Sequence, residues 1–533
     1  MKLTRQPWIV ISALALIVAV GGWLRFQVAT NDLLWLDELH TGWVVDAPAF
    51  SDIASRAADG NQTPVYFWVT RLLIQLPIQP ELGLRLASLF AGIALNLIAS
   101  LWVWRWSGSR LGALLTATLI ASDLNFIYYS TEARPYALME LLSIFQFGLF
   151  FELLWPSAPK LPADENAHPK SNLKLQIPFA LVSLVMLYTH LTSVWLLVTE
   201  GLTLAICFLK YPTLVRRIQL WLPATAIICG GFLPFAFVTR NIYSRRTNWE
   251  SVSSIPNLLT NYLPVLLITI IAPLLFWGIY LIFKKQKSRL TVRQRQQLGL
   301  ILLWAIIPFC CVILATLIGI APLALNRYTL IGAAAIPIFA GCFAVAFQSV
   351  VERAIFVALL LCSMIFAGIS LSPNAMNPFA GKENLPHFRV EDWRTPIEKI
   401  NSVLGDREQP VFLFANIIED ADSTKIDDLR FQNYLLFPLS WPYLLNRTYP
   451  NVSAGATLAE PHFRPTQIQQ ALESRGCWVI VRGNKELAER IGLELEVNLK
   501  VEMAENSMSP PIPIQTQFYE TPRSPVYLIS VSW

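Results

Sequence analysis

The chain has 533 residues, of which 54% are hydrophobic and only 14% are charged. Soluble domains carry about 25% charged residues, so this composition excludes an ordinary soluble enzyme, a disordered chain and a collagen-like protein. The formal net charge is +5, but most of the basic excess lies in short loops between apolar runs, where it reports membrane orientation and not a nucleic-acid partner.

The first apolar run extends from Trp8 to about Val28 and follows a short head that carries Lys2 and Arg5. Its length of about 20 residues and the lack of a small-residue cleavage site favour a retained membrane span over a signal peptide. Ten further apolar runs follow, and the sequence therefore predicts a mostly α-helical transmembrane bundle of eleven spans. These ten runs lie near residues 82–104, 111–129, 135–155, 176–190, 191–209, 218–239, 262–283, 298–320, 329–348 and 354–371.

The loops that separate these runs predict how the chain is oriented. With the N-terminus inside, every cytoplasmic loop holds Lys or Arg, most densely at residues 284–295, and the positive-inside rule is obeyed. An odd number of spans then places residues 372–533 on the outer face. The alternative is that residues 176–209 form one long span and a re-entrant piece, which removes this parity argument.

Residues 372–533 are rich in Pro, Asn, Asp and Glu, and they predict a separate extracytoplasmic α/β domain that follows a transmembrane module of residues 1–371. Strands are expected at 411–415, 478–481 and 526–531, and helices at 391–400, 464–475 and 485–491. The first of these helices has its apolar positions on one stripe, formed by Trp393, Ile397, Ile400 and Leu404. Six of the seven cysteines lie in apolar runs, so no disulfide framework is expected.

The long loop at residues 29–81 carries the first candidate site, in the segment Leu34-Trp-Leu-Asp-Glu-Leu-His-Thr-Gly-Trp43. Mixed aromatic and polar residues of this kind are typical of short helices in the membrane interface. If residues 35–45 are helical, Asp37, His40 and Thr41 share one face, and Glu38 points about 100° away. We therefore expect Asp37 to be the catalytic carboxylate and Glu38 to support it. The alternative is a solvated Asp-Glu pair at a helix start.

A second cluster stands between the third and fourth runs, where the sequence reads Tyr128-Tyr-Ser-Thr-Glu-Ala-Arg-Pro-Tyr136. Pro135 suits the first turn of a helix and favours an extended Arg134 just before it. Arg134 would then lie where a lipid phosphate sits, beside Glu132 and Tyr136. The alternative is an arginine that snorkels to the interface and pairs with Glu132.

Further cations lie at the predicted outer ends of later runs, where the orientation rule disfavours them. Phosphate recognition would explain them, because guanidinium groups bind phosphate oxygens bidentately. Alternatively, each of these cations could be an interfacial anchor. His190 could instead be a hydrogen-bonded residue at the end of a helix. The remaining substrate-binding candidates are His40, Tyr66, His190, Arg240, Arg245, Arg246, Arg327 and Tyr328.

Together these motifs resemble the bacterial branch of the protein O-mannosyltransferase and aminoarabinose-transferase superfamily. The shared order is an outer-loop Asp-Glu, then Thr-Pro-x-Tyr-Phe, Glu-Ala-Arg-Pro-Tyr, Tyr-x-His and Asn-Arg-Tyr. The segment Glu391-Asp-Trp-Arg394 also looks like the entry to the C-terminal domain of such proteins. The resemblance implies a GT-C fold glycosyltransferase with Asp37 and Glu38 as the acidic pair. One departure is Gln62-Thr63, where related enzymes often have charged residues, so other arginines would have to bind the phosphate.

The sequence therefore predicts an integral membrane enzyme, of the bacterial inner-membrane type, with its active site on the extracytoplasmic face. It would transfer a sugar from a polyprenyl-phosphate donor to a lipid, glycan or protein acceptor, and the resemblance implies inversion. Its partners would include membrane lipids and no nucleic acid. No metal-ligand set stands out beyond Asp37 and Glu38, where a divalent cation is the alternative to metal-independent transfer.

Three other interpretations compete with this one. A glycan polymerase or ligase would take its substrate from a polyprenyl pyrophosphate and would need more arginines. A transporter or flippase would show internal repeats and ionisable residues in the middle of spans, whereas here the ionisable residues are expected to gather at one face. A purely structural anchor would not need eleven spans.

Overall fold

The computed structural model describes residues 7–154, 173–210, 221–244, 254–284, 290–347, 349–370, 391–404, 409–415, 433–443, 456–457, 460–461, 463–505, 513–520 and 524–533. The chain forms two compact units. The helical unit comprises Met1–Ala29, Asn61–Leu73 and Arg85–Pro386, and the loop–sheet unit comprises Thr30–Gly60, Ile74–Leu84 and His387–Trp533. Much of the first loop is thus grouped with the C-terminal residues. The predicted boundary between residues 371 and 372 stays a prediction.

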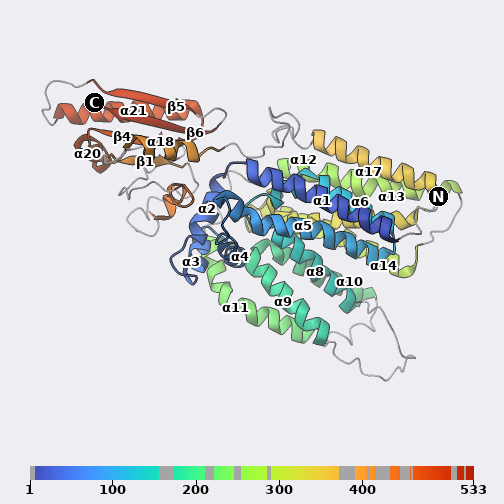
Figure 1. The fold of residues 1–533 in the computed structure, drawn as a ribbon. Helices are drawn as coiled ribbons and strands as arrows, with labels where there is room; N and C mark the ends of the chain where they lie inside the picture. Colours follow the sequence, from blue (N-terminus) through green and yellow to red (C-terminus); the bar gives the residue numbers. More distant parts are fainter. Residues whose placement is uncertain are drawn as a thin grey trace. The chain divides into compact units, whose positions relative to one another are not determined.

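Helices coincide with all eleven predicted apolar runs (Figure 1). Within the described ranges, five helical segments are long and apolar enough to cross a membrane, and the bent pair α6–α7 makes a sixth. The chain is an integral membrane protein, while the count of eleven crossings stays a prediction. The helices are α1 (Pro7–Asn31), α4 (Val65–Leu73), α5 (Pro80–Ser107), α6 (Arg110–Ser122), α7 (Leu124–Ser130), α8 (Tyr136–Leu154), α9 (Leu173–Thr189), α10 (Val194–Lys210), α11 (Leu222–Ser244), α12 (Ile255–Leu266), α13 (Ala272–Lys284), α14 (Val292–Leu317), α15 (Leu330–Ala333), α16 (Ala335–Phe343) and α17 (Val350–Ser370).

Small residues allow the backbones of α6 and α16 to approach closely. A Cβ atom on Gly341 would lie 2.6 Å from the Gly112 carbonyl oxygen, a distance that no real side chain tolerates. Thr116 adds a hydrogen bond from its hydroxyl to the Pro337 carbonyl oxygen at 3.1 Å. Between membrane helices, close backbone packing and such polar contacts replace the hydrophobic drive that lipid removes.

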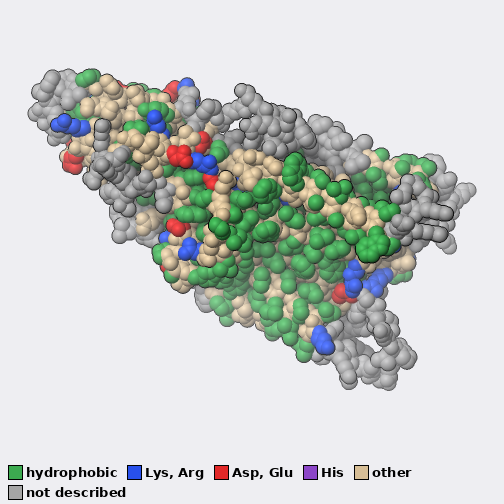
Figure 2. Space-filling view, viewed as in Figure 1, with side chains coloured by type: hydrophobic (Ala, Val, Ile, Leu, Met, Phe, Trp, Pro, Cys, Tyr) green, Lys and Arg blue, Asp and Glu red, His purple; other side chains and the backbone are tan. Residues whose placement is uncertain are grey.

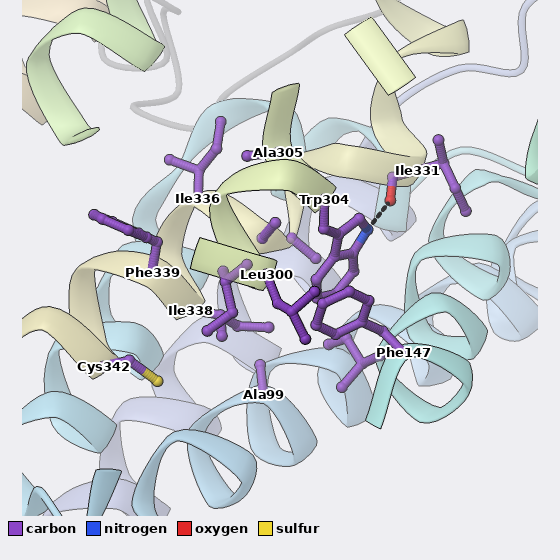
Figure 3. Packing of buried hydrophobic residues seen from close by; sticks show 14 of the residues in the cluster. Ala99, Phe147, Leu300, Trp304, Ala305, Ile331, Ile336, Ile338, Phe339 and Cys342 are labelled. Atoms are coloured by element: carbon purple, nitrogen blue, oxygen red, sulfur yellow. Dashed lines mark hydrogen bonds between the residues drawn. The ribbon is translucent and has the colours of Figure 1, made fainter. Parts of the chain in front are cut away.

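The core of the helical unit is built around Trp304 of α14 (Figure 3). Its ring stacks on Phe147 of α8 with the centroids 4.4 Å apart. Its indole nitrogen donates to the Ile331 carbonyl oxygen at 2.7 Å, which pairs the one polar atom that burial would otherwise leave unsatisfied. Helices α8, α14 and α15 are thereby held together.

The visible surface of the helical unit is apolar (Figure 2), and basic residues lie beside the C-terminal end of α8. Figure 2 shows hydrophobic side chains over the visible face of the helices, the kind of surface that faces lipid. At the C-terminal end of α8, Arg105 approaches Glu152 to 4.0 Å and Arg293 lies 5.8 Å from the ring of Phe151. Residues 136 and 152 are about 24 Å apart along α8 at 1.5 Å per residue. These basic residues therefore lie far from Tyr136.

The loop–sheet unit contains the four-stranded sheet β1-β4-β6-β5, in which β1 pairs parallel with β4 and the other pairs are antiparallel. The three predicted strands are confirmed, and the polar edge strand β5 was not predicted. The predicted helix at 485–491 is confirmed but extends to residue 505, and the predicted apolar stripe of α18 is buried. The elements are α2 (Leu36–Val45), α3 (Asp52–Asp59), α18 (Arg394–Leu404), β1 (Val411–Phe414), β2 (Ala456–Thr457), β3 (Glu460–Pro461), α20 (Pro465–Glu473), β4 (Gly476–Arg482), α21 (Lys485–Glu505), β5 (Gln515–Glu520) and β6 (Val526–Ser532).

Candidate active site

A break between α6 and α7 presents the segment that carries Glu132 and Arg134. The two helices are bent by 64° at Asp123. The Asp123 carboxylate accepts from the two backbone amides at the start of α7, at 2.9 and 3.1 Å, and so caps that helix. Helix α7 ends after two turns, and Pro135 lies at the start of α8 as predicted, where its carbonyl oxygen accepts from the Met139 amide at 2.9 Å.

A buried arginine from α1 fastens this break. Arg25 is 1% exposed and donates to the carbonyl oxygens of Ile120 at 2.7 Å and Ala121 at 3.3 Å, at the unpaired end of α6. Its Nε also donates to the Ser130 hydroxyl at 2.8 Å, at the end of α7. Gly92 of α5 leaves room for Ser130, because a Cβ atom there would clash with it. The sequence analysis missed Arg25, although a lone arginine in an apolar run was a signal.

A relay of hydroxyl groups holds the backbone of Arg134. The Ser88 hydroxyl donates to the Arg134 carbonyl oxygen at 2.9 Å, and the Tyr66 hydroxyl lies 2.9 Å from the same Ser88 oxygen. A serine hydroxyl has one proton, so Tyr66 is the donor of the second bond. Tyr66 is fully buried and acts on Arg134 through Ser88. Its predicted contact with substrate stays a prediction.

The structure brings the other predicted residues of the helical unit together in a row of rings. The centroid of Tyr136 lies 5.3 Å from that of Tyr129 and 5.3 Å from that of His190. The His190 ring lies 6.1 Å from Tyr328, and the Arg327 guanidinium carbon lies 5.4 Å from the Tyr328 ring centroid. These residues come from α7, α8, the α9–α10 junction and the turn Asn326–Tyr328, so the row is a tertiary feature.

His190 is a neutral imidazole. Burial, with the nearby charges of Arg134 and Arg327, lowers the pKa of His190 to about 3. The Thr192 backbone amide donates to Nδ1 at 3.3 Å, so Nδ1 is an acceptor and the ring proton is assigned to Nε2. His190 therefore offers an N–H donor at neutral pH and no charge.

The guanidinium groups of Arg134 and Arg327 both act electrostatically on the rings of His190 and Tyr136. The charges of Arg134 and Arg327 both reach His190 and Tyr136, and the Glu132 carboxylate also acts on Tyr136. Glu132 and Arg134 are 2% and 5% exposed, so neither is a solvated surface charge. Two converging cations beside N–H and O–H donors suit a phosphate group, which arginine binds through paired hydrogen bonds.

The predicted acidic pair lies in the loop–sheet unit. Helix α2 covers residues 36–45, which confirms the expected helix, and Asp37 and Glu38 stand in its first turn. Asp37 is half-buried, whereas Glu38 is fully buried and accepts from the Trp35 amide at 3.4 Å. The two carboxylates thus differ in burial, while their predicted roles stay predictions. Glu38 closes the helix start, and Asp37 keeps access to solvent.

His40 contacts aromatic side chains of its own unit. Its ring centroid lies 5.8 Å from Trp43, 5.8 Å from Tyr434 and 5.4 Å from Phe437. His40 is 5% exposed and therefore packs α2 against residues that lie about 400 positions later in the chain. Its predicted contact with substrate stays a prediction.

Three of the predicted arginines cannot be assigned to the site. Arg245 and Arg246 lie outside the described residues, and the side chain of Arg240 in α11 is also outside them. Among the residues that the structure describes, no group of three or more His, Cys, Asp or Glu side chains is placed to hold a metal ion.

Acidic residues also lie inside two helices, which corrects the expectation that ionisable residues gather at one face. Glu140 of α8 is 1% exposed and lies near Arg25 and Asp123. Glu200 of α10 is 3% exposed and accepts from the Gln146 amide at 2.6 Å. The sequence analysis overlooked both because each is a single acid in an apolar run.

In sequence, no protein-family model and no curated protein matches the chain. In structure, it is similar to ArnT from Cupriavidus metallidurans bound to undecaprenyl phosphate, with a TM-score of 0.51 and 12% identity over 98% of this chain and 97% of that chain. The chain has a GT-C fold. ArnT in the apo state matches over the same shares with a TM-score of 0.50 and 14% identity.

An archaeal oligosaccharyltransferase is also similar. AglB from Archaeoglobus fulgidus, in complex with an inhibitory peptide and a dolichol-phosphate, has a TM-score of 0.47 and 12% identity over 98% of this chain and 74% of that chain. The fold class expected from the motifs is thus confirmed by the ArnT matches.

Proposed function

We propose that this protein transfers a sugar from a polyprenyl-phosphate carrier to an acceptor on the extracytoplasmic side of the membrane. The observation that carries the proposal is the pair Arg134 and Arg327 around neutral His190, in a chain with a GT-C fold. The similar ArnT structure was solved with undecaprenyl phosphate, a ligand of the same chemical class. Such a carrier presents an activated sugar where nucleotide sugars are absent.

The reaction is a single displacement at the anomeric carbon. The acceptor hydroxyl attacks the face opposite the phosphate, the bond from the anomeric carbon to the phosphate oxygen breaks, and the configuration inverts. Asp37 takes the acceptor proton and stabilises the positive charge that develops on the sugar. The electron pair leaves with the polyprenyl phosphate, whose charge Arg134 and Arg327 stabilise.

The arginines supply the charge that a metal ion would otherwise provide at the phosphate, so transfer is proposed to be metal-independent or weakly dependent. A divalent cation at Asp37 and Glu38 is the competing arrangement. Transfer in the presence of EDTA, with and without added Mg²⁺ or Mn²⁺, separates the two. Loss of transfer with EDTA and its recovery with one ion would favour the cation.

The experiment uses membranes that contain the full chain and radiolabelled polyprenyl-phosphate hexoses or pentoses. Label is then sought in lipid, glycan and protein fractions, which identifies the acceptor class. Asp37→Asn should reduce transfer by about a hundredfold or more, since loss of a general base costs 10² to 10⁴. Asp52→Asn is the matched control, because Asp52 is an exposed carboxylate in the same loop. Undiminished transfer by Asp37→Asn would remove Asp37 from the base role.

Other outcomes would identify the competing functions. Label that enters glycan only from a polyprenyl pyrophosphate oligosaccharide indicates a polymerase or ligase. Movement of intact labelled lipid between leaflets without a transferred sugar indicates a flippase. Either result would overturn the proposal.

A further inference from the structure

The carboxylate of Glu391 joins the start of α2 to the C-terminal part of the chain. Its Oε2 accepts from the Leu36 amide at 2.9 Å and from the Trp393 indole nitrogen at 2.9 Å. Its Oε1 accepts from Arg482 at the end of β4, at 2.9 Å from Nε and 2.8 Å from Nη2. Glu391 is 7% exposed, and every neighbour that these bonds reach is a donor. Only a carboxylate satisfies all of them.

The placement of this carboxylate bears on Asp37. The Leu36 amide is one of the unpaired N–H groups of the first turn of α2, and a negative charge there is stabilised by the helix dipole. Asp37 is the next residue along the chain. The bond to Glu391 therefore fixes the position and direction of the turn from which Asp37 projects.

Arg394 makes a second attachment at the other end of the first loop. It pairs with Glu81, in the first turn of α5, and Glu81 also accepts from the Tyr443 hydroxyl at 3.0 Å. The Arg394 guanidinium carbon lies 5.4 Å from the Tyr443 ring centroid. Two residues of one short segment thus hold the loop near both of its ends.

The segment that carries these two residues is itself well fixed. Trp393 is 1% exposed, and the Asp392 carboxylate accepts from the Thr395 amide at 3.0 Å and from its hydroxyl at 2.8 Å, which caps α18. The segment can hold α2 in place because it is itself fixed. A mobile segment would transmit its motion to α2.

We propose that Glu391 and Arg394 clamp the first loop onto the C-terminal residues and thereby position Asp37 for proton transfer. Both are positioning residues, because they act through α2 and α5 and not on substrate. The clamp gives the C-terminal residues an indirect part in catalysis, through the position of Asp37. The role of Asp37 in this statement rests on the proposed function, whereas the attachment of α2 does not.

The first test is Glu391→Gln in the full chain, purified in lipid nanodiscs. The side-chain nitrogen of glutamine cannot accept a hydrogen bond, so the donors that face one of the two Glu391 oxygens lose their partner. We expect kcat to fall between about tenfold and a hundredfold, since a misplacement of about 1 Å has that effect, with the donor KM unchanged within about twofold. Hydrogen exchange of residues 34–46 should become faster. Glu489→Gln, which removes an exposed glutamate of α21, is the matched control.

The second test exchanges the charges of the other attachment. Arg394→Glu and Glu81→Arg should each lower kcat at least about fivefold, and the double variant should recover at least half of that loss on a logarithmic scale. Arg490→Gln of α21 is the control for removal of an arginine from the same unit. If Glu391→Gln does not fold, this pair decides the question. A double variant that is no better than the worse single variant would overturn the clamp.

The outcomes separate the clamp from the proposed function. Unchanged kcat and unchanged exchange of residues 34–46 in folded Glu391→Gln contradict the clamp. A fall in donor affinity equal to the fall in kcat also contradicts it, because the defect then lies in donor binding. If the wild-type chain transfers no sugar, the proposed function fails, while hydrogen exchange still tests whether Glu391 holds α2.

Discussion

The arginine-bearing junction of the helical unit and the Asp37 segment of the loop–sheet unit are held in place by different means. Arg134 follows a helix break that Arg25 fastens inside the packed bundle, and the Tyr66–Ser88 relay holds its backbone. Asp37 stands on a short helix whose start is tied to Glu391, far along the chain. The half that is proposed to bind phosphate thus depends on helix packing, and the carboxylate half depends on a few polar contacts over long sequence separation.

This difference predicts separable defects. Changes in the helical unit should alter donor binding, and changes at the clamp should alter the rate of the chemical step. The following variants test that separation, beginning with the largest expected effect.

Removal of Arg134 should have the largest effect on donor binding. Arg134→Gln removes a charge-assisted contact to phosphate worth about 1.5 to 3 kcal/mol, so the donor KM should rise about tenfold to a hundredfold. The donor KM of Arg134→Lys should lie between those of the wild type and Arg134→Gln, since lysine keeps the charge but cannot form the paired hydrogen bonds. Arg105→Gln, at the other end of the helices, is the matched control. An equal rise in the donor KM of Arg134→Gln and Arg105→Gln would show that only the overall charge of the protein matters.

Removal of Arg25 should loosen the α6–α7 break. Arg25→Met leaves the Ser130 hydroxyl and two carbonyl oxygens without their donor, which should lower the free energy of unfolding by about 2 to 4 kcal/mol. The donor KM should rise by about tenfold, and Arg25→Lys should recover part of both losses. Thermal unfolding in detergent and initial rates measure these quantities. Faster hydrogen exchange of residues 34–46 would contradict the separation of the two halves.

The pKa of His190 predicts an acid-labile helical unit. The unfolded chain binds a proton at His190 below about pH 6.5, and the folded chain does so only near pH 3. Between these values the unfolded state holds more protons, so stability falls as the pH falls from about 6.5 toward 3 and is unaffected above 6.5. His190→Gln should flatten this part of the curve of melting temperature against pH. An unchanged curve in His190→Gln would show that other groups cause the acid lability.

The smallest effect is expected for Glu200→Gln. Glu200 accepts from Gln146 between α10 and α8, and such contacts between membrane helices contribute about 0.6 to 2 kcal/mol. Stability should fall by about 1 kcal/mol or less, and the transfer rate should stay within about twofold. Ser183→Ala, beside the same glutamine, is the control. Complete loss of transfer with intact folding would contradict this expectation and give the mid-span acid a part in the transfer reaction.

Local patterns in the sequence were sufficient to locate the helices of the apolar runs and most strands of the sheet, although α21 is longer than predicted. The apolar runs correspond to helices, and the stripe from Trp393 to Leu404 is buried, because both depend on residues within a few turns of one another. The same is true of α2, which was expected at residues 35–45 and covers residues 36–45. Strand β5 was missed because its exposed, polar residues carry no hydrophobic alternation.

The amino-acid sequence by itself determined that this chain enters a membrane, which segments are helical and which charged residues interrupt the apolar pattern. Only the tertiary structure decided that Arg25 fastens a helix break, that Tyr66 reaches Arg134 through Ser88, and that Glu391 holds the helix of Asp37. The physical reason is the separation along the chain of the residues that interact. Periodicity and capping follow from neighbours along the chain, whereas a buried charge finds its partners only where folding brings distant segments together.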